Sequence, residues 1–315
     1  MKTTILALLG LALSLPAYAA DPDTITVYSA RKEHLIKPLF DAYTEQTGVQ
    51  IRYITDKAGP LLARLKAEGA NTPADMLMTV DAGNLWQAAE SGVLSPVESE
   101  ALNQNIPAHL RDPGNQWFGL SIRARTIVYS TDRVKPANLT SYEDLADPKW
   151  RGRLCLRTSK KVYNQSLVAM MIARHGEENT SQIIEGWVAN LATEPFSNDT
   201  MAMQAIVAGQ CDVAIVNTYY FGRLQKEEPD MKLALFWPNQ DTTGVHVNIS
   251  GAGVTKQAKN RDGAIQLLEW LSSEQAQQQF AGLNMEYPIN PAVAADAVVA
   301  AWGDFKACLL YTSPS

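Results

Sequence analysis

Strand-like and helix-like segments alternate along this sequence, and this alternation limits the folds that it can adopt. Short runs rich in β-branched or apolar residues are each followed by a stretch whose apolar residues recur at helical spacing. In the first third of the chain, the predicted strands are 24–28, 50–55 and 74–80, and the predicted helices are 33–45, 61–68 and 84–90. Regular alternation favours an α/β fold with a mostly parallel sheet that helices cover on both faces. Pro38 lies inside the first helix and predicts a kink or a later helix start.

The alternation resumes after residue 119. Strands are predicted at 122–130, 152–157 and 212–217, helices at 164–174, 180–191, 200–208, from Tyr219 onward and at 261–271, and extended segments at 233–237 and 245–255. The 315 residues are enough for two domains, yet no Gly/Ser-rich linker separates the two halves. We therefore expect segments 122–128 and 247–254 to be strands that cross between two domains.

Two domains joined by crossing strands place a ligand site between them, at the carboxyl ends of their strands. We expect an N-terminal lobe formed by residues 20–122 and 250–285. The C-terminal lobe is expected to comprise residues 123–249, with residues 286–306 packed against it. Each lobe is predicted to hold a mixed, mostly parallel sheet flanked by helices.

Both ends of the sequence differ from the segments between them. Lys2, the apolar run 5–15 and the small residues up to Ala19 predict a secretory signal peptide spanning residues 1–19 and hence a periplasmic location. The run is too short to span a bilayer as a stable helix. Residues 307–315 contain no charge, helix cap or periodicity, and we interpret them as a truncated or non-native tail.

Composition and missing motifs exclude several classes of protein. The 33 acidic residues outnumber the 27 basic ones, which argues against nucleic-acid binding because phosphate contacts need a basic face. No G-x-S-x-G nucleophile elbow and no H-E-x-x-H zinc motif occur, so the sequence offers no evident hydrolytic site. These features favour a binding protein over an enzyme, and we expect a monomer.

Two of the three cysteines lie in strand-like segments. Cys155 stands in Leu-Cys-Leu-Arg157, and Cys211 precedes the apolar run 213–216. An oxidising periplasm favours a disulfide between them, whereas two buried thiols are equally compatible with the sequence.

Two adjacent tyrosines are the most informative candidates for a functional site. Tyr219 and Tyr220 lie where a predicted buried strand ends and a helix begins. The positive end of the helix dipole favours a phenolate there, and a hard trivalent cation such as Fe³⁺ stabilises phenolate oxygen strongly. An adjacent Tyr pair is more often core packing, and it can also stack on an organic ligand.

Further candidate residues lie near the ends of other predicted strands. Tyr163 precedes a helix in the same lobe as the tyrosine pair, where it can be a ligand or an aromatic staple at the helix start. Glu33 and His34 follow the first strand and can be ligands from the other lobe, although such residues are more often solvated. Three arginines can hold an anion or pair with carboxylates; they are Arg31, Arg123 and Arg125.

A series of short motifs between residues 24 and 306 matches one family in order, although each motif alone is weak. The motifs are Val27-Tyr-Ser-Ala-Arg31, Lys66–Asp75, Trp117-Phe-Gly119, Asp147–Gly152, Tyr163-Asn-Gln-Ser166, Asn198-Asp199, Asn217-Thr-Tyr-Tyr220, Pro238-Asn-Gln240 and Glu286-Tyr-Pro288. With these motifs the chain resembles the periplasmic ferric-ion-binding proteins of bacterial iron(III) ABC importers. This is a family with the two-lobed fold of type 2 periplasmic binding proteins.

The resemblance implies that Tyr163, Tyr219 and Tyr220 bind Fe³⁺ between the lobes and that an inner-membrane ABC permease receives the iron. Relatives complete the ligand shell with first-lobe residues or with a synergistic anion such as carbonate. Some relatives place His and then Tyr shortly after the Tyr-Ser-x-Arg motif, whereas this chain has Lys32, Glu33 and His34 in that region, so its spacing departs from theirs. The shell is then completed by His34 or Glu33, or by an anion on the three arginines named above. A binding protein of the same fold for a carboxylate or phosphonate is the alternative.

Overall fold

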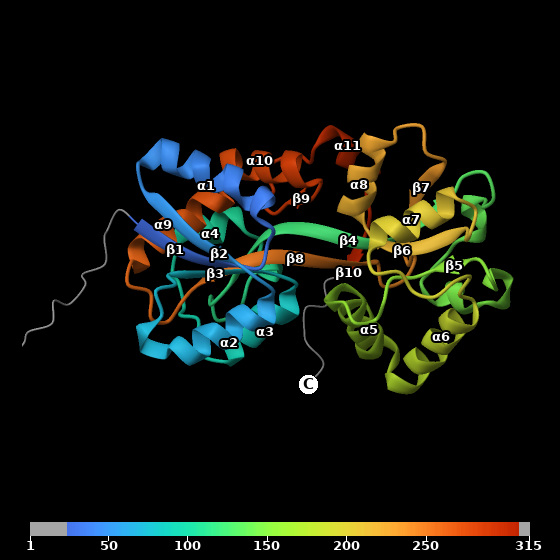
Figure 1. The fold of residues 1–315 in the computed structure, drawn as a ribbon, viewed down its shortest axis with the longest axis horizontal. Helices are drawn as coiled ribbons and strands as arrows, with labels where there is room; N and C mark the ends of the chain where they lie inside the picture. Colours follow the sequence, from blue (N-terminus) through green and yellow to red (C-terminus); the bar gives the residue numbers. More distant parts are fainter. Residues whose placement is uncertain (1–23, 309–315) are drawn as a thin grey trace, which may run out of the picture.

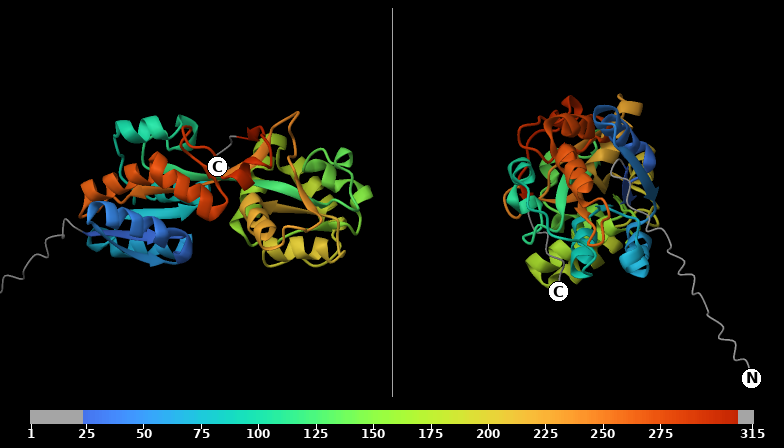
Figure 2. Two further views of the ribbon diagram at one scale, coloured as in Figure 1. Left: turned by 90° about the horizontal axis from the view of Figure 1, so that it is seen from above. Right: turned by 90° about the vertical axis from the view of Figure 1, so that its left-hand side faces the viewer.

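The structure, a computed structural model, describes residues 24–308 and consists of two lobes (Figure 1). Residues 1–19, the predicted signal peptide, and residues 309–315 of the predicted tail lie outside the described part. Strands β4 (Phe118–Ser130) and β8 (Val245–Val254) run from one lobe into the other. In the view from above, the ribbon narrows between the lobes (Figure 2). The prediction of two lobes joined by crossing strands is therefore confirmed.

The first lobe is built on a sheet of three parallel strands, and strand β8 extends this sheet at one edge. Strand β1 pairs in parallel with β2 and β3, and β3 pairs antiparallel with β8. The strands are β1 (Thr24–Ser29), β2 (Gln50–Thr55) and β3 (Met76–Val80). Helices cover both faces of this sheet, namely α1 (Glu33–Thr47), α2 (Ala58–Glu68), α3 (Ala82–Glu90), α4 (Glu100–Asn105), α9 (Arg261–Ser272) and α10 (Glu274–Asn284).

The helices of the first lobe differ from the prediction in the start of α2 and in two helices that were not predicted, α4 and α10. Helix α1 starts at Glu33, so Pro38 lies inside the helix and does not delay its start. Helix α2 starts at Ala58 rather than at residue 61, because a proline such as Pro60 is tolerated in the first turn of a helix. Helix α10 was not predicted; its buried residues, among them Phe280, are interspersed with glutamines that weaken the apolar pattern.

The second lobe contains a smaller mixed sheet with helices around it. Strand β4 pairs antiparallel with β6 and β7, and β5 pairs in parallel with β6. Its strands are β5 (Leu154–Cys155), β6 (Val213–Asn217) and β7 (Leu233–Phe236), and its helices are α5 (Val162–His175), α6 (Glu177–Ala189), α7 (Asp199–Val207) and α8 (Thr218–Glu227). Strand β5 is thus shorter than the predicted strand 152–157.

Strand β4 changes partners along its length, and this change marks the passage between the lobes. Residues 118–124 pair with β8, whereas residues 125–129 pair with β6. Gly251 of β8 lies so close to the backbone of Phe118 that a Cβ atom there would overlap its carbonyl oxygen. The tight contact between the two crossing strands therefore requires a residue without a side chain.

A third chain segment also passes from the first lobe to the second. Strand β9 (Tyr287–Pro288) pairs with β4, and α11 (Ala297–Ala300) then lies beside α8 (Figure 1). Strand β10 (Ala307–Cys308) pairs in parallel with β8, and Cys308 is buried. The tail predicted from residue 307 is therefore structured at its first two residues, because they extend a sheet edge. Among the helices within residues 24–308, none has the length and apolarity needed to cross a bilayer.

Cys155 and Cys211 form a disulfide, which decides between the two alternatives left by the sequence. The bond joins β5 to the segment just before β6 across 56 residues, and both cysteines are buried. It therefore connects the strand before Arg157 to the strand that leads into Tyr219.

Replacing both cysteines, in the double variant Cys155→Ser and Cys211→Ser, is expected to lower the free energy of unfolding by about 2–4 kcal/mol, because the unfolded chain regains the freedom that the cross-link removed. Urea unfolding with and without reductant measures this effect. Reductant should destabilise the wild type and leave the double variant unchanged. Equal stability of the two proteins without reductant would contradict the prediction.

Candidate metal site

The junction of β6 and α8 presents two tyrosines side by side. Strand β6 is buried along its whole length, and α8 follows it directly, so that Tyr219 and Tyr220 occupy the first turn of the helix. Tyr219 is buried, Tyr220 is half-buried, and their ring centroids are 4.3 Å apart. The first turn of a helix carries free N–H groups and partial positive charge, which favour negative charge on nearby oxygen atoms.

Tyr163 joins this pair from the first turn of α5. The guanidinium of Arg123 lies 5.6 Å from the ring centroid of Tyr163 and 5.9 Å from that of Tyr219. The guanidinium of Arg157 lies 5.3 Å from the Tyr163 ring and 5.8 Å from the Tyr220 ring. The structure therefore brings the three predicted tyrosines together around two shared arginines, and these five residues are called the tyrosine cluster below.

The environment of Tyr219 keeps its hydroxyl protonated in the metal-free protein. Burial, followed by the proximity of Tyr163 and Tyr220, raises the pKa of Tyr219 well above 10, and Arg123 only partly opposes this. Burial alone would lower the pKa of Arg123, but the charges of Tyr163 and Glu286 outweigh it and raise that pKa. A positively charged Arg123 beside these phenols suits a cluster that becomes anionic when a cation binds.

Arg31 lies in the interior of the protein, paired with a residue that the sequence did not connect to it. Its guanidinium forms an ion pair of 3.1 Å with Glu286 and donates a hydrogen bond of 2.6 Å to the hydroxyl of Ser250. Arg123 lies 3.7 Å from the same carboxylate. Glu286 therefore contacts both buried arginines, and Arg123 is the one that lies against the tyrosines.

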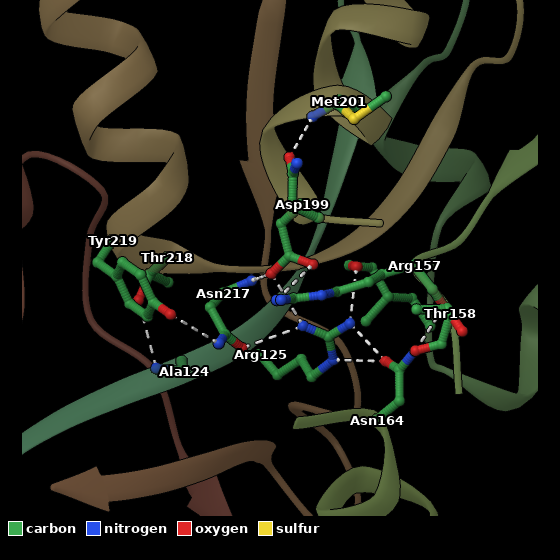
Figure 3. A network of polar contacts seen from close by, with 12 residues as sticks. Ala124, Arg125, Arg157, Thr158, Asn164, Asp199, Met201, Asn217, Thr218 and Tyr219 are labelled. Atoms are coloured by element: carbon green, nitrogen blue, oxygen red, sulfur yellow. Dashed lines mark hydrogen bonds and ion pairs between the residues drawn. The ribbon is translucent and has the colours of Figure 1, made fainter. Parts of the chain in front are cut away.

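Arg125 is likewise fully engaged in a buried polar network (Figure 3). Its guanidinium bonds to Asp199 and to the side-chain oxygen of Asn217, each at 3.1 Å, and to the side-chain oxygen of Asn164 at 3.0 Å. These partners come from α7, from the end of β6 and from the first turn of α5. Arg125 therefore joins the helices that carry the tyrosines, and its donors are already occupied.

Arg157 also belongs to the tyrosine cluster, although the sequence did not predict it as a candidate. It is 8% exposed, its Nε and Nη1 atoms have no hydrogen-bond partner within residues 24–308, and it lies 3.6 Å from Asp199. The signal in the sequence was an arginine at the end of a predicted strand in the lobe that holds the tyrosines. That signal was weak, because arginines at strand ends are common on protein surfaces.

The two candidate ligands from the first lobe, Glu33 and His34, have no hydrogen bond or ion pair to the tyrosine cluster within residues 24–308. Glu33 and His34 are exposed at the start of α1. The carboxylate of Glu33 accepts a hydrogen bond of 2.9 Å from the hydroxyl of Tyr53, and no hydrogen bond or ion pair joins the side chain of His34 to another residue within the described range. Nor does that range contain a group of three or more His, Cys, Asp or Glu residues able to hold a metal ion.

Two α/β lobes that are joined by crossing strands and meet at a polar cluster define a solute-binding protein of the two-lobed type. The chain belongs to the family of bacterial extracellular solute-binding proteins, whose family model matches residues 38–307.

Several relatives within this family are connected with iron by name. The chain is 48% identical over 296 residues to iron uptake protein A2 of Synechocystis sp., covering 91% of this chain and 84% of the relative. It is similar to the structure of a Trichodesmium protein in complex with iron and citrate ligands, with 44% identity and a TM-score of 0.85 over 91% and 92% of the two chains. Ferric iron-binding protein A of Mannheimia haemolytica in an open conformation gives 39% identity and a TM-score of 0.83 over 90% and 91%.

Proposed function

We propose that this protein captures Fe³⁺ in the periplasm through Tyr163, Tyr219 and Tyr220 and delivers it to an inner-membrane ABC permease. The observation that carries the proposal is the convergence of three phenols on two arginines at the meeting point of two lobes. Membership of a solute-binding family and the names of the relatives support transport rather than catalysis.

The donor atoms favour ferric iron over other transition metals. Phenolate oxygen is a hard ligand that matches a small, highly charged cation, whereas Zn²⁺ and Cu⁺ prefer nitrogen or sulfur. The described range contains no group of three or more His, Cys, Asp or Glu residues able to hold a metal ion, so the phenol oxygens are the donors in this proposal. Such a shell stabilises Fe³⁺ relative to Fe²⁺ and therefore suits capture rather than redox cycling.

An anion bound by Arg123 and Arg157 completes the ferric shell in this proposal. Both arginines lie against the tyrosine rings, and the Nε atom of each is buried without a hydrogen-bond partner among residues 24–308. By contrast, all three nitrogens of the Arg125 guanidinium are hydrogen-bonded, and Arg31 lies over the ring of Phe280 rather than over a tyrosine. Three phenolates leave ligand positions open on an ion that favours six. Carbonate, or a carboxylate such as citrate, can fill them while its charge is balanced by the arginines. His34 and Glu33, both exposed on α1, are the alternative donors.

Titration of the mature protein with ferric iron tests the proposal. The alternative is that the protein binds a small organic anion, a carboxylate or a phosphonate, in place of iron. Tyrosinate bound to Fe³⁺ gives a visible charge-transfer band, whereas carboxylates or phosphonates bound without iron give none. Absence of the band at saturating ferric citrate would reject the proposed function.

Ferric binding is expected to release protons and to weaken as the pH falls. The pKa of Tyr219 is raised well above 10 in the metal-free protein, so this phenol must lose a proton near pH 7 before it can bind iron. Lower pH favours the protonated, metal-free form, and the apparent affinity should fall about tenfold per pH unit for each proton released. Titration in weakly buffered solution counts these protons. A pH-independent affinity between pH 6 and 8 would contradict tyrosinate ligation.

A further inference from the structure

Asp81 connects the two lobes, and its backbone conformation is unusual for a residue with a side chain. It lies between β3 and α3 with φ 77° and ψ 128°, and it is 1% exposed. A positive φ is uncommon outside glycine and persists where surrounding contacts hold it. Here the backbone N–H of Asp81 donates a hydrogen bond of 2.9 Å to the carbonyl of Ile249 in β8, which fixes the residue to a crossing strand.

The carboxylate of Asp81 contacts both lobes at once. Its Oδ1 atom accepts a hydrogen bond of 2.9 Å from the backbone N–H of Gly83 and so caps α3 in the first lobe. Its Oδ2 atom accepts a hydrogen bond of 2.5 Å from the hydroxyl of Ser166 in α5 of the second lobe. The same oxygen accepts a hydrogen bond from the side-chain amide of Asn248 in β8. One carboxylate therefore joins α3, a crossing strand and α5.

Ser166 connects this contact directly to the tyrosine cluster. It follows Tyr163 by three residues on α5, so the two side chains lie on the same face of the helix, one turn apart. The neighbouring Leu167 and Met171 are buried in the core of the second lobe, which makes α5 move with that lobe. A bond from Ser166 to the first lobe therefore holds the end of α5 that carries Tyr163.

Asn248 extends the same connection to the arginine of the cluster. It pairs with Arg123 across β8 and β4, and its side-chain oxygen accepts a hydrogen bond of 3.0 Å from the backbone N–H of Ala82. Arg123 lies against Tyr163 and Tyr219, so Asp81 is linked to the cluster through both the helix and the crossing strand.

We propose that Asp81 is a positioning residue for iron retention, whose bond to Ser166 holds the lobes together with Tyr163 in place. The inference rests on the proposed function, because it assigns Asp81 a part in keeping iron bound. When lobes separate about crossing strands, contacts between them are lost while contacts within each lobe persist. The Asp81–Ser166 bond is of the first kind, and the carboxylate makes it stronger than a bond between neutral groups.

The variant Ser166→Ala tests this proposal, because it removes the hydroxyl and leaves the cap on α3 and all three tyrosines intact. We expect ferric iron to dissociate about tenfold to a hundredfold faster, the range that corresponds to one hydrogen bond to a charged group. The charge-transfer band and the iron stoichiometry should stay unchanged. Ser166→Thr retains a hydroxyl and should restore slow dissociation. Ser181→Ala, an exposed position on α6, is the matched control and should behave like the wild type.

A second measurement makes the test independent of iron. Small-angle X-ray scattering of the metal-free proteins should give a larger radius of gyration for Ser166→Ala than for the wild type and for Ser181→Ala. If the wild type lacks the charge-transfer band, the proposed function fails, and the scattering comparison alone decides the role of Asp81. Equal dissociation rates, or without a band equal radii, for Ser166→Ala and Ser181→Ala would overturn the inference.

Discussion

Tyr219→Phe and Tyr220→Phe are each expected to weaken ferric binding by more than about a hundredfold while the protein stays folded. Each change removes one phenolate ligand, and losing a direct ligand costs more than the 10–100-fold typical of residues that only support ligands. The rings remain in place, because Tyr219 and Tyr220 pack against each other and Arg223 lies over the Tyr219 ring. Competition with citrate, followed through the charge-transfer band, measures the loss.

A tyrosine of the same lobe outside the cluster provides the control. Tyr129 lies in β4 and is buried, but no ring contact or ion pair links it to the cluster. Tyr129→Phe should therefore bind iron as the wild type does. Ferric affinity that stayed at the wild-type level in both cluster variants would reject the proposed site.

Asp199→Asn is expected to reduce the free energy of unfolding by about 3–5 kcal/mol, because it leaves a buried arginine without its counter-charge. Asp199 is fully buried, forms an ion pair of 3.1 Å with Arg125 and lies 3.6 Å from Arg157. Its carboxylate also accepts a hydrogen bond of 3.0 Å from the backbone N–H of Asn217 (Figure 3). Ferric affinity should fall as well, since Arg157 and the start of α8 lose a common partner.

Asp212 offers a matched comparison for this effect. It also pairs with two arginines of the second lobe, Arg133 at 2.5 Å and Arg153 at 2.6 Å, but both arginine side chains are more than one-third exposed. Water and salt screen such pairs, so Asp212→Asn should cost no more than about 1 kcal/mol. Urea unfolding of both variants gives the comparison. Equal losses of stability would show that burial does not set the cost of removing these carboxylates.

Local patterns were sufficient to predict much of the architecture. The alternation of apolar runs and helical periodicity identified most of the strands and helices, and the lack of a linker predicted that β4 and β8 cross between lobes. The same reasoning placed Tyr219 and Tyr220 at a strand-to-helix junction. Helix α10 was not predicted, because its many glutamines weaken the helical spacing of the apolar residues, among them the buried Phe280.

Sequence alone thus determined the two-lobed α/β fold, which follows from residue types at short spacing, and the family resemblance predicted the three tyrosines as the site. Tertiary structure alone decided how the buried charges pair. Arg31 meets Glu286 across 255 residues, Arg125 meets Asp199 across 74, and Asp81 meets Ser166 across 85. No periodicity encodes such pairs, because a buried charge accepts whichever counter-charge or donor the packing of distant elements brings within reach. These pairings leave Arg123 and Arg157, and not Arg31 or Arg125, facing the tyrosines.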